Sequence, residues 1–201
     1  SMEVHAGTTT AVVGRNGAGK TTLLRSIMGL VTPSGGTIHL DDENLTRSPA
    51  HTRTRVGIGY APEDRVIFPT LSVEENLRLP CDVLGLSEPE MQERLSHVLD
   101  VVPQLKPMLG RSGAALSGGQ GKMVALGRAL MVGKTLVLLD EPFQGLAPAL
   151  AQQYAEALAR LRQSRPDLAV IITESNAALL TDIPNQILTI ERGSFVEAST
   201  H

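Results

Sequence analysis

A glycine-rich stretch with the sequence GRNGAGKTT, residues 14–22, constrains the fold of this chain more than any other feature. It lies between an apolar, strand-like run at residues 8–13 and a helix-like run at residues 23–30. The stretch fits the pattern G-x-x-x-x-G-K-[ST], in which backbone N–H groups curl around a polyphosphate and the positive end of the following helix points at the same place. The sequence therefore predicts a strand, a phosphate loop and a helix, in a chain that binds a nucleoside triphosphate.

Individual positions of this loop have expected roles. Lys20 adds a mobile cation for the outer phosphates, and the hydroxyl of Thr21 is the expected ligand of Mg²⁺. The predicted nucleotide-binding residues of the loop are Gly14, Asn16, Gly17, Ala18, Gly19, Lys20, Thr21 and Thr22.

Two neighbouring acids follow the apolar run TLVLL. A continuous apolar run is typical of a strand covered on both faces of a parallel sheet, and the carboxyl edge of such a sheet is where ligands bind. At this edge Asp140 can hold Mg²⁺ through water, while Glu141 can orient or deprotonate an attacking water. Glu63 follows another strand-like run, GIGYAP, and two interpretations are open for it: a group at the same sheet edge or a solvated acidic turn.

Capped helices are expected from Ser72 onward. Three pairs have capping-box spacing: Ser72 with Glu75, Ser87 with Glu90, and Ser117 with Gln120. The last pair belongs to the motif LSGGQ, which opens a helix expected to run through Met131. Local physics favours a plain capped helix start at this motif, and a second anion site at the helix N-terminus is the open alternative.

Strands alternate with helices along the rest of the chain. An alanine-rich helix is expected over residues 148–164, followed by the strand AVIIT, the polar sequence ESN and a closing hairpin at residues 187–198. This alternation predicts an α/β fold with a mostly parallel sheet covered by helices. With 201 residues, the chain can bury one full core and a small appended subdomain.

Composition argues against several other classes. The net charge of −3 disfavours a protein that binds nucleic acid through bulk electrostatics. The single cysteine, Cys81, cannot form an internal disulfide and is expected to be a buried structural thiol, and no two histidines have the spacing of zinc ligands. The sequence shows no signal peptide and no apolar stretch long enough to span a bilayer, so a reducing, cytosolic setting is expected.

Together, GRNGAGKTT, LSGGQ and LVLLDEP resemble, in order and spacing, the nucleotide-binding subunit of ATP-binding cassette (ABC) transporters over essentially the whole chain. PEDRVIFPTLSVEENL, GLAP and the closing E-x-N look most like the second ATPase of importers for branched-chain amino acids, amides or urea. The resemblance implies a P-loop NTPase fold with a small helical subdomain. Its expected parts are an ATP-binding core at residues 1–71 and 132–201, and a helical subdomain at residues 72–115 that continues into the LSGGQ helix at 116–131.

The resemblance also implies partners and cofactors. Two such subunits would form a head-to-tail dimer that holds ATP and Mg²⁺ between the phosphate loop of one and the LSGGQ of the other, and residues 145–148 would cross the interface. Residues 72–108 would help to receive a helix of the transmembrane subunit, at the cytoplasmic face of the membrane. Glu63 stands where the family usually has a glutamine that reaches Mg²⁺. The residues that would contact the γ-phosphate of the partner's ATP are Ser117, Gly118, Gly119 and Gln120.

Two departures from the family pattern affect the expected activity. The switch histidine of the family falls at Ser175, whose side chain is shorter, so we expect slow intrinsic hydrolysis with Asn176 as the substitute donor. The aromatic residue that usually stacks on adenine lies upstream of the phosphate loop, and residues 1–13 contain none. We therefore expect the complete domain to begin before Ser1, and weak ATP binding without that segment.

Three functions compete on these grounds. The leading one is an ATP-hydrolysing subunit that powers import, favoured by Lys20, Asp140 and Glu141. The second is an ATP-gated clamp or regulatory module that dimerises but hydrolyses poorly, favoured by Ser175. A nucleic-acid-handling ATPase is disfavoured by the acidic charge balance and the scarcity of aromatic residues. The sequence leaves the transported solute open, because selectivity is expected in the membrane and solute-binding partners.

Overall fold

The computed structural model describes residues 1–196. A six-stranded sheet forms its centre, with the strand order β4-β5-β6-β1-β7-β8, and all neighbours are parallel apart from the β7–β8 hairpin. These strands are β1 (Thr9–Val13), β4 (Ile58–Ala61), β5 (Leu136–Asp140), β6 (Ala169–Glu174), β7 (Gln186–Glu191) and β8 (Ser194–Val196). The predicted α/β fold with a mostly parallel sheet is confirmed.

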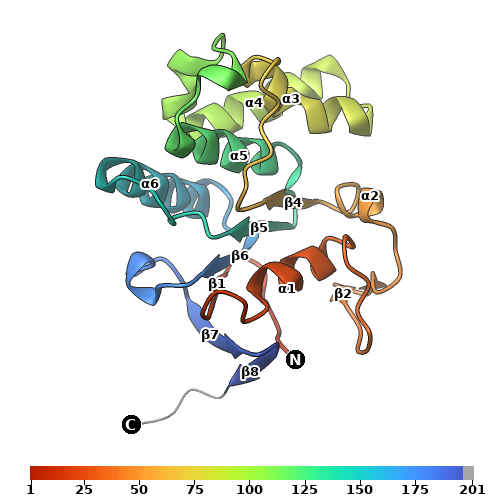
Figure 1. Cartoon of the computed structure of the whole chain (residues 1–201). Helices are drawn as coiled ribbons and strands as arrows, with labels where there is room; N and C mark the ends of the chain where they lie inside the picture. Colours follow the sequence, from red (N-terminus) through yellow and green to blue (C-terminus); the bar gives the residue numbers. More distant parts are fainter. Residues whose placement is uncertain (197–201) are drawn as a thin grey trace.

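Helices cover both faces of this sheet (Figure 1). One face carries α1 (Lys20–Ile27), with the small ribbon of β2 (His39–Leu40) and β3 (Glu43–Asn44) and the short α2 (Ala50–Arg53) nearby. The other face carries the longer helices, which are α3 (Val73–Leu84), α4 (Glu88–Val101), α5 (Gly118–Val132) and α6 (Pro148–Ser164). Among residues 1–196, three short 3₁₀ helices complete the elements: η1 (Pro103–Met108), η2 (Gly113–Ala115) and η3 (Ala177–Leu179).

The apolar run of β5 packs on both faces of the sheet. Val137 and Leu139 belong to the core beneath α5 and α6, whereas Leu136 and Leu138 belong to the core beneath α1. Side chains alternate between the faces of a strand, so a strand covered on both sides needs apolar residues at every position. This burial explains why the sequence here is continuously apolar.

The helices α3, α4 and α5 gather at the end of the molecule opposite to the β7–β8 hairpin (Figure 1). All three predicted capping boxes are present, at the first turns of these three helices. Cys81 lies in α3 and is buried, as expected for a structural thiol. The residue boundaries of the core and of the helical subdomain stay a prediction.

Some boundaries differ from those expected. α1 spans Lys20–Ile27 rather than 23–30. It begins directly after Gly19, and it ends before Gly29 because this residue, with φ of 71°, turns the chain away from the helix. The hairpin follows the prediction as far as Val196, and its expected last residues, 197–198, lie outside the described residues, as does His201. Within residues 1–196, no helix combines the length and the apolarity needed to cross a bilayer.

The register of the sheet brings three strand ends together. β6 lies between β1 and β5, so Val13 pairs with Glu174 and Asp140 pairs with Thr173. Since parallel strands end at the same edge of a sheet, the phosphate loop after β1 and the acids at the ends of β5 and β6 meet there.

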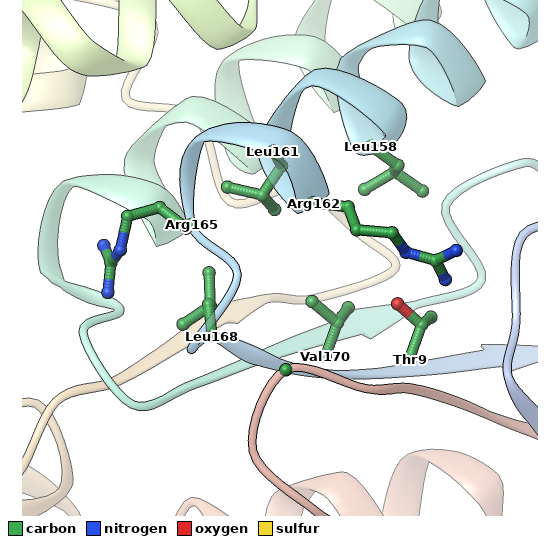
Figure 2. A pocket seen from close by; sticks show the side chains of 8 residues that line it. Thr9, Leu158, Leu161, Arg162, Arg165, Leu168 and Val170 are labelled. Atoms are coloured by element: carbon green, nitrogen blue, oxygen red, sulfur yellow. The ribbon is translucent and has the colours of Figure 1, made fainter.

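A small hollow lies at the other edge of the sheet, between α6 and the first residues of β1 and β6 (Figure 2). Its lining is mostly apolar, and a volume of about 10 Å³ leaves no room for a ligand. The guanidinium groups of Arg162 and Arg165 point in opposite directions, and each donates to a backbone carbonyl at 2.6 Å. We therefore place the functional site at the carboxyl edge.

Candidate active site

The phosphate loop joins β1 to α1 (Figure 1). Gly17 and Gly19 have φ of 81° and 112°, conformations that glycine adopts with little strain. α1 begins directly at Lys20, so the free N–H groups of its first turn lie at the loop. The loop thus has the permissive backbone and the helix N-terminus that a bound phosphate requires.

Lys20 is the buried cation of the site, with 4% of its surface exposed. Its Nζ donates to the carbonyl oxygens of Gly14 at 2.6 Å and Arg15 at 3.1 Å. The same Nζ lies 3.0 Å from Oε1 of Glu141. The structure therefore brings the loop lysine and the acid after β5 into one ion pair.

Glu141 lies in the left-handed region with φ of 49°, which is a strained conformation for a residue with a side chain. Its Oε1 accepts a hydrogen bond from the hydroxyl of Ser175 at 2.6 Å, and its Oε2 accepts one from the Ser175 N–H at 3.1 Å. Burial alone would raise the pKa of Glu141, but hydrogen bonds from Ser175 and Lys20 outweigh it and leave the pKa below its usual value. At neutral pH Glu141 is an ionised proton acceptor.

Asp140 lies beside an open cleft with a volume of about 640 Å³. Thr21, Glu63 and Tyr60 line the same cleft. The hydroxyl of Thr173 donates to Oδ1 of Asp140 at 2.6 Å, while Oδ2 is buried and has no hydrogen-bond partner. An unpartnered carboxylate oxygen near a hydroxyl and a second carboxylate fits a hard divalent cation. The three predicted Mg²⁺ ligands are thus brought to one cleft.

The structure also places the remaining predicted residues of the loop and of the end of β6. Asn16 is part of the site, because its Oδ1 lies 2.8 Å from the hydroxyl of Ser175, which can donate to Asn16 or to Glu141. Ala18 is a buried residue of the loop, and Thr22 lies in the first turn of α1. Asn176 instead accepts a hydrogen bond from the N–H of Ala178 at the start of η3, so its catalytic role stays a prediction.

The motif LSGGQ lies apart from the phosphate loop of its own chain. Its residues open α5, and the Ser117 and Gln120 side chains cap the first turn. Ser117 and Gly118 are exposed, and none of the five motif residues lines the cleft beside Asp140. Within one chain the motif is a capped helix start, and its contact with the γ-phosphate of a partner's ATP stays a prediction.

Four residues of this region were missed by the sequence reasoning: Tyr60, Lys122, Thr173 and Glu174. Tyr60 lines the cleft, and burial together with Asp140 raises its pKa, so its hydroxyl stays protonated. Lys122 donates to the carbonyl oxygen of Glu141, and Glu174 accepts from the N–H of Phe143. The position of Glu174 at a strand end beside the phosphate loop was the available signal.

Glu174 is fully buried, and its Oε2 has no hydrogen-bond partner. Burial, together with the neighbouring Glu141 carboxylate, raises its pKa to about 8. Between pH 4.5 and 8 the unfolded chain therefore loses a proton that the folded chain keeps, so this group lowers stability progressively as pH rises through that window.

We expect Glu174→Gln to be more stable than the wild type at pH 8, by at least about 1 kcal/mol, because each pKa unit corresponds to about 1.4 kcal/mol. The amide keeps the acceptor for Phe143 N–H and can donate to Glu141. Urea unfolding at pH 5 and pH 8 checks this, since the advantage should shrink strongly at pH 5. An advantage of equal size at both pH values would contradict it.

A parallel sheet with a glycine-rich loop before a helix, a buried lysine at the end of that loop and two acids at the carboxyl end of β5, one strand removed from β1, defines a P-loop nucleoside triphosphatase. The sequence profile of the ABC transporter family matches residues 1–144. The chain belongs to the ABC transporter family: it is an ATP-binding subunit, and an ATPase, of such a transporter.

Individual relatives agree with this assignment. The chain is 34% identical over 191 residues to a probable branched-chain amino acid transport ATP-binding protein LivF from Archaeoglobus fulgidus, covering 95% of this chain and 80% of that protein. It is 36% identical over 200 residues to the high-affinity branched-chain amino acid transport ATP-binding protein BraG from Pseudomonas aeruginosa. This alignment covers 100% of this chain and 84% of BraG. A solved ATP-binding subunit of an ABC transporter superposes with a TM-score of 0.83 at 28% identity, covering 99% and 81%.

Other relatives have different cargo. An Fe(3+) ion import ATP-binding protein, FbpC from Pseudomonas fluorescens, is 37% identical to this chain. The alignment covers 98% of this chain and 55% of FbpC. A lipopolysaccharide export ATP-binding protein, LptB from Acidithiobacillus ferridurans, is 32% identical and covers 100% and 82%. The family assignment therefore leaves the transported solute open.

Proposed function

We propose that the chain powers an importer of branched-chain amino acids or related amides by hydrolysing ATP with Glu141 as the general base. The observation that carries the mechanism is the cluster in which Lys20 and Ser175 both contact the Glu141 carboxylate. The solute is proposed from LivF and BraG, whose names specify branched-chain amino acid transport.

The chemistry follows from the charges of the cluster. Lys20 would neutralise the outer phosphates. The ionised Glu141 would accept a proton from a water molecule while the oxygen of that water attacks the γ-phosphorus and the bond from the γ-phosphorus to the bridging oxygen breaks. Thr21, Asp140 and Glu63 would hold Mg²⁺, which supplies further positive charge to the phosphates. Ser175 would keep the Glu141 carboxylate in place through its N–H and hydroxyl.

Two surfaces support an assembly with partners. The LSGGQ residues at the start of α5 do not line the cleft beside Asp140 of their own chain, and a head-to-tail dimer would place them against the ATP of a second copy. An apolar groove of about 330 Å³ between Val66 and Phe68 on one side and Pro80 and Val83 on the other would receive a helix of the transmembrane subunit, at the membrane surface. Val83 is 75% exposed, which suits a side chain covered by a partner.

Uptake in proteoliposomes tests this function. The adjacent reading frames would be sequenced, the chain would be reconstituted with the membrane and solute-binding proteins found there, and ATP-dependent uptake of leucine, acetamide, Fe(3+) and urea would be compared. We expect uptake of leucine or of the amide. ATP-dependent dimerisation with little ATP turnover and no uptake of any solute would favour the alternative, an ATP-gated clamp.

Substitution of Ser175 tests whether the end of β6 limits turnover. Ser175→His loses the hydroxyl contact with Glu141 but keeps the backbone N–H contact. It should raise kcat by about tenfold or more, because one donor to a developing charge is commonly worth 10²-fold and serine reaches less far than histidine. Steady-state ATPase assays check this, with Asn176→Ala as the test of the second predicted donor. Unaltered rates in both variants would mean that this strand end takes no part in catalysis.

A further inference from the structure

The turn that carries Glu141 is held by side chains from two different elements. It spans residues 141–144 directly after β5, and its own bonding is weak, since the N–H of Gln144 reaches the carbonyl oxygen of Glu141 only at 3.3 Å. Glu141 has a positive φ of 49°, a backbone conformation that persists only where the surroundings enforce it. The contacts that enforce it therefore decide where the Glu141 carboxylate points.

Lys122 makes the closest of these contacts. Its Nζ donates to the carbonyl oxygen of Glu141 at 2.6 Å and to that of Gln144 at 2.8 Å, so one ammonium joins both ends of the turn. The side chain is half-buried, and it comes from the second turn of α5, the helix that Ser117 opens. A charged donor bridging two carbonyl oxygens is stronger than a neutral hydrogen bond.

Glu174, the last residue of β6, contacts the same turn. Its Oε1 accepts a hydrogen bond from the N–H of Phe143 at 2.8 Å, between the two carbonyl oxygens that Lys122 binds. Thr173, its neighbour on β6, accepts from the N–H of Glu141 through both its carbonyl and its hydroxyl, each at 3.1 Å. With β6 fixing one side of the turn, Lys122 is the contact that fixes the other.

We propose that Lys122 is a positioning residue for ATP hydrolysis: by bridging the carbonyl oxygens of Glu141 and Gln144, it fixes the backbone of Glu141 and thereby aims its carboxylate. This inference rests on the proposed role of Glu141 as the base. It also connects the catalytic turn directly to the helix that begins with LSGGQ.

Kinetics of Lys122→Met test the inference. The thioether keeps the length of the side chain but donates no hydrogen bond, so kcat should fall by about tenfold or more, as expected for a misplaced catalytic group, while KM for ATP and the affinity for a non-hydrolysable analogue change by less than about twofold. Lys122→Arg can still donate to two carbonyl oxygens and should recover most of the rate.

A double variant separates positioning from a general structural role. Because Lys122 acts through Glu141, Lys122→Met should slow single-turnover hydrolysis no further when Glu141 is already Gln. The matched control is Arg94→Met. Arg94 lies on α4 and donates to the carbonyl oxygen of Met131 at 2.9 Å, so the variant removes a similar contact to α5, at the end of that helix and away from the turn. It should leave kcat unchanged. Melting curves of all variants, and Lys122→Ala if the Met variant fails to fold, complete the set.

The outcomes distinguish this inference from the function on which it rests. Wild-type hydrolysis by Glu141→Gln would overturn the assignment of the base and the inference with it. A slow Glu141→Gln together with a normal kcat for Lys122→Met would overturn the inference alone. An equal further loss in the Glu141→Gln background, or no recovery with Lys122→Arg, would also overturn it.

Discussion

Glu141→Gln should bind ATP with nearly unchanged affinity and hydrolyse it at least about a hundredfold more slowly, as is typical when general-base assistance is lost. The amide is the same size as the carboxylate and keeps its hydrogen-bonding contacts with Ser175, but it cannot accept a proton from water. It also loses the ion pair with Lys20, which leaves the ammonium free to meet the phosphates. Stopped-flow binding and single-turnover hydrolysis measure the two quantities separately.

The same variant reports on assembly. If two copies enclose ATP head to tail, blocked hydrolysis should trap them, and light scattering with ATP and Mg²⁺ should show a dimer. The matched control is Glu156→Gln, an exposed acid on α6 whose side chain accepts a hydrogen bond from its helix neighbour Gln152. It should hydrolyse ATP like the wild type. A Glu141→Gln protein that turns over normally would refute the base assignment, and one that stays monomeric with ATP would refute the dimer.

Lys20→Ala should lose about a hundredfold or more in affinity for ATP, because each hydrogen bond to a charged group is worth about 1.5–3 kcal/mol and a lysine ammonium donates several. The variant should also be less stable without nucleotide. Lys20 and Glu141 form an ion pair in which each side chain is only 4% exposed, and removing one partner strands the other charge. Isothermal titration and denaturant unfolding measure the two losses, and ATP affinity equal to the wild type would refute the site.

A double variant tests the physical reason for the loss of stability. Breaking a buried ion pair costs about 3–5 kcal/mol when a charge is left unpaired, so Lys20→Ala combined with Glu141→Gln should be more stable than Lys20→Ala alone. The control is Lys106→Ala, whose pair with Asp100 is exposed, and the expected effect there is below about 1 kcal/mol. A double variant no more stable than Lys20→Ala would show that Glu141 is not stranded.

Local sequence patterns predicted most elements of the fold. The helix α6 (Pro148–Ser164) has the expected bounds, and the capping boxes and the strand before Asp140 are where the sequence placed them. These features depend on contacts between residues a few positions apart, or on burial that requires apolar residues at fixed spacing. For the same reason the phosphate loop was evident, since its glycines and Lys20 lie within one short stretch.

The sequence by itself determined the class of protein, the order of its strands and helices, and the identity of Lys20, Asp140 and Glu141 as candidate site residues. Only the tertiary structure decided which groups surround Glu141. Ser175 and Lys122 reach it because β6 lies beside β5 and because α5 packs across the sheet, and neither fact is encoded in a local pattern. Such contacts depend on strand register and on the few polar atoms that burial leaves to pair with one another, which are properties of the whole folded chain.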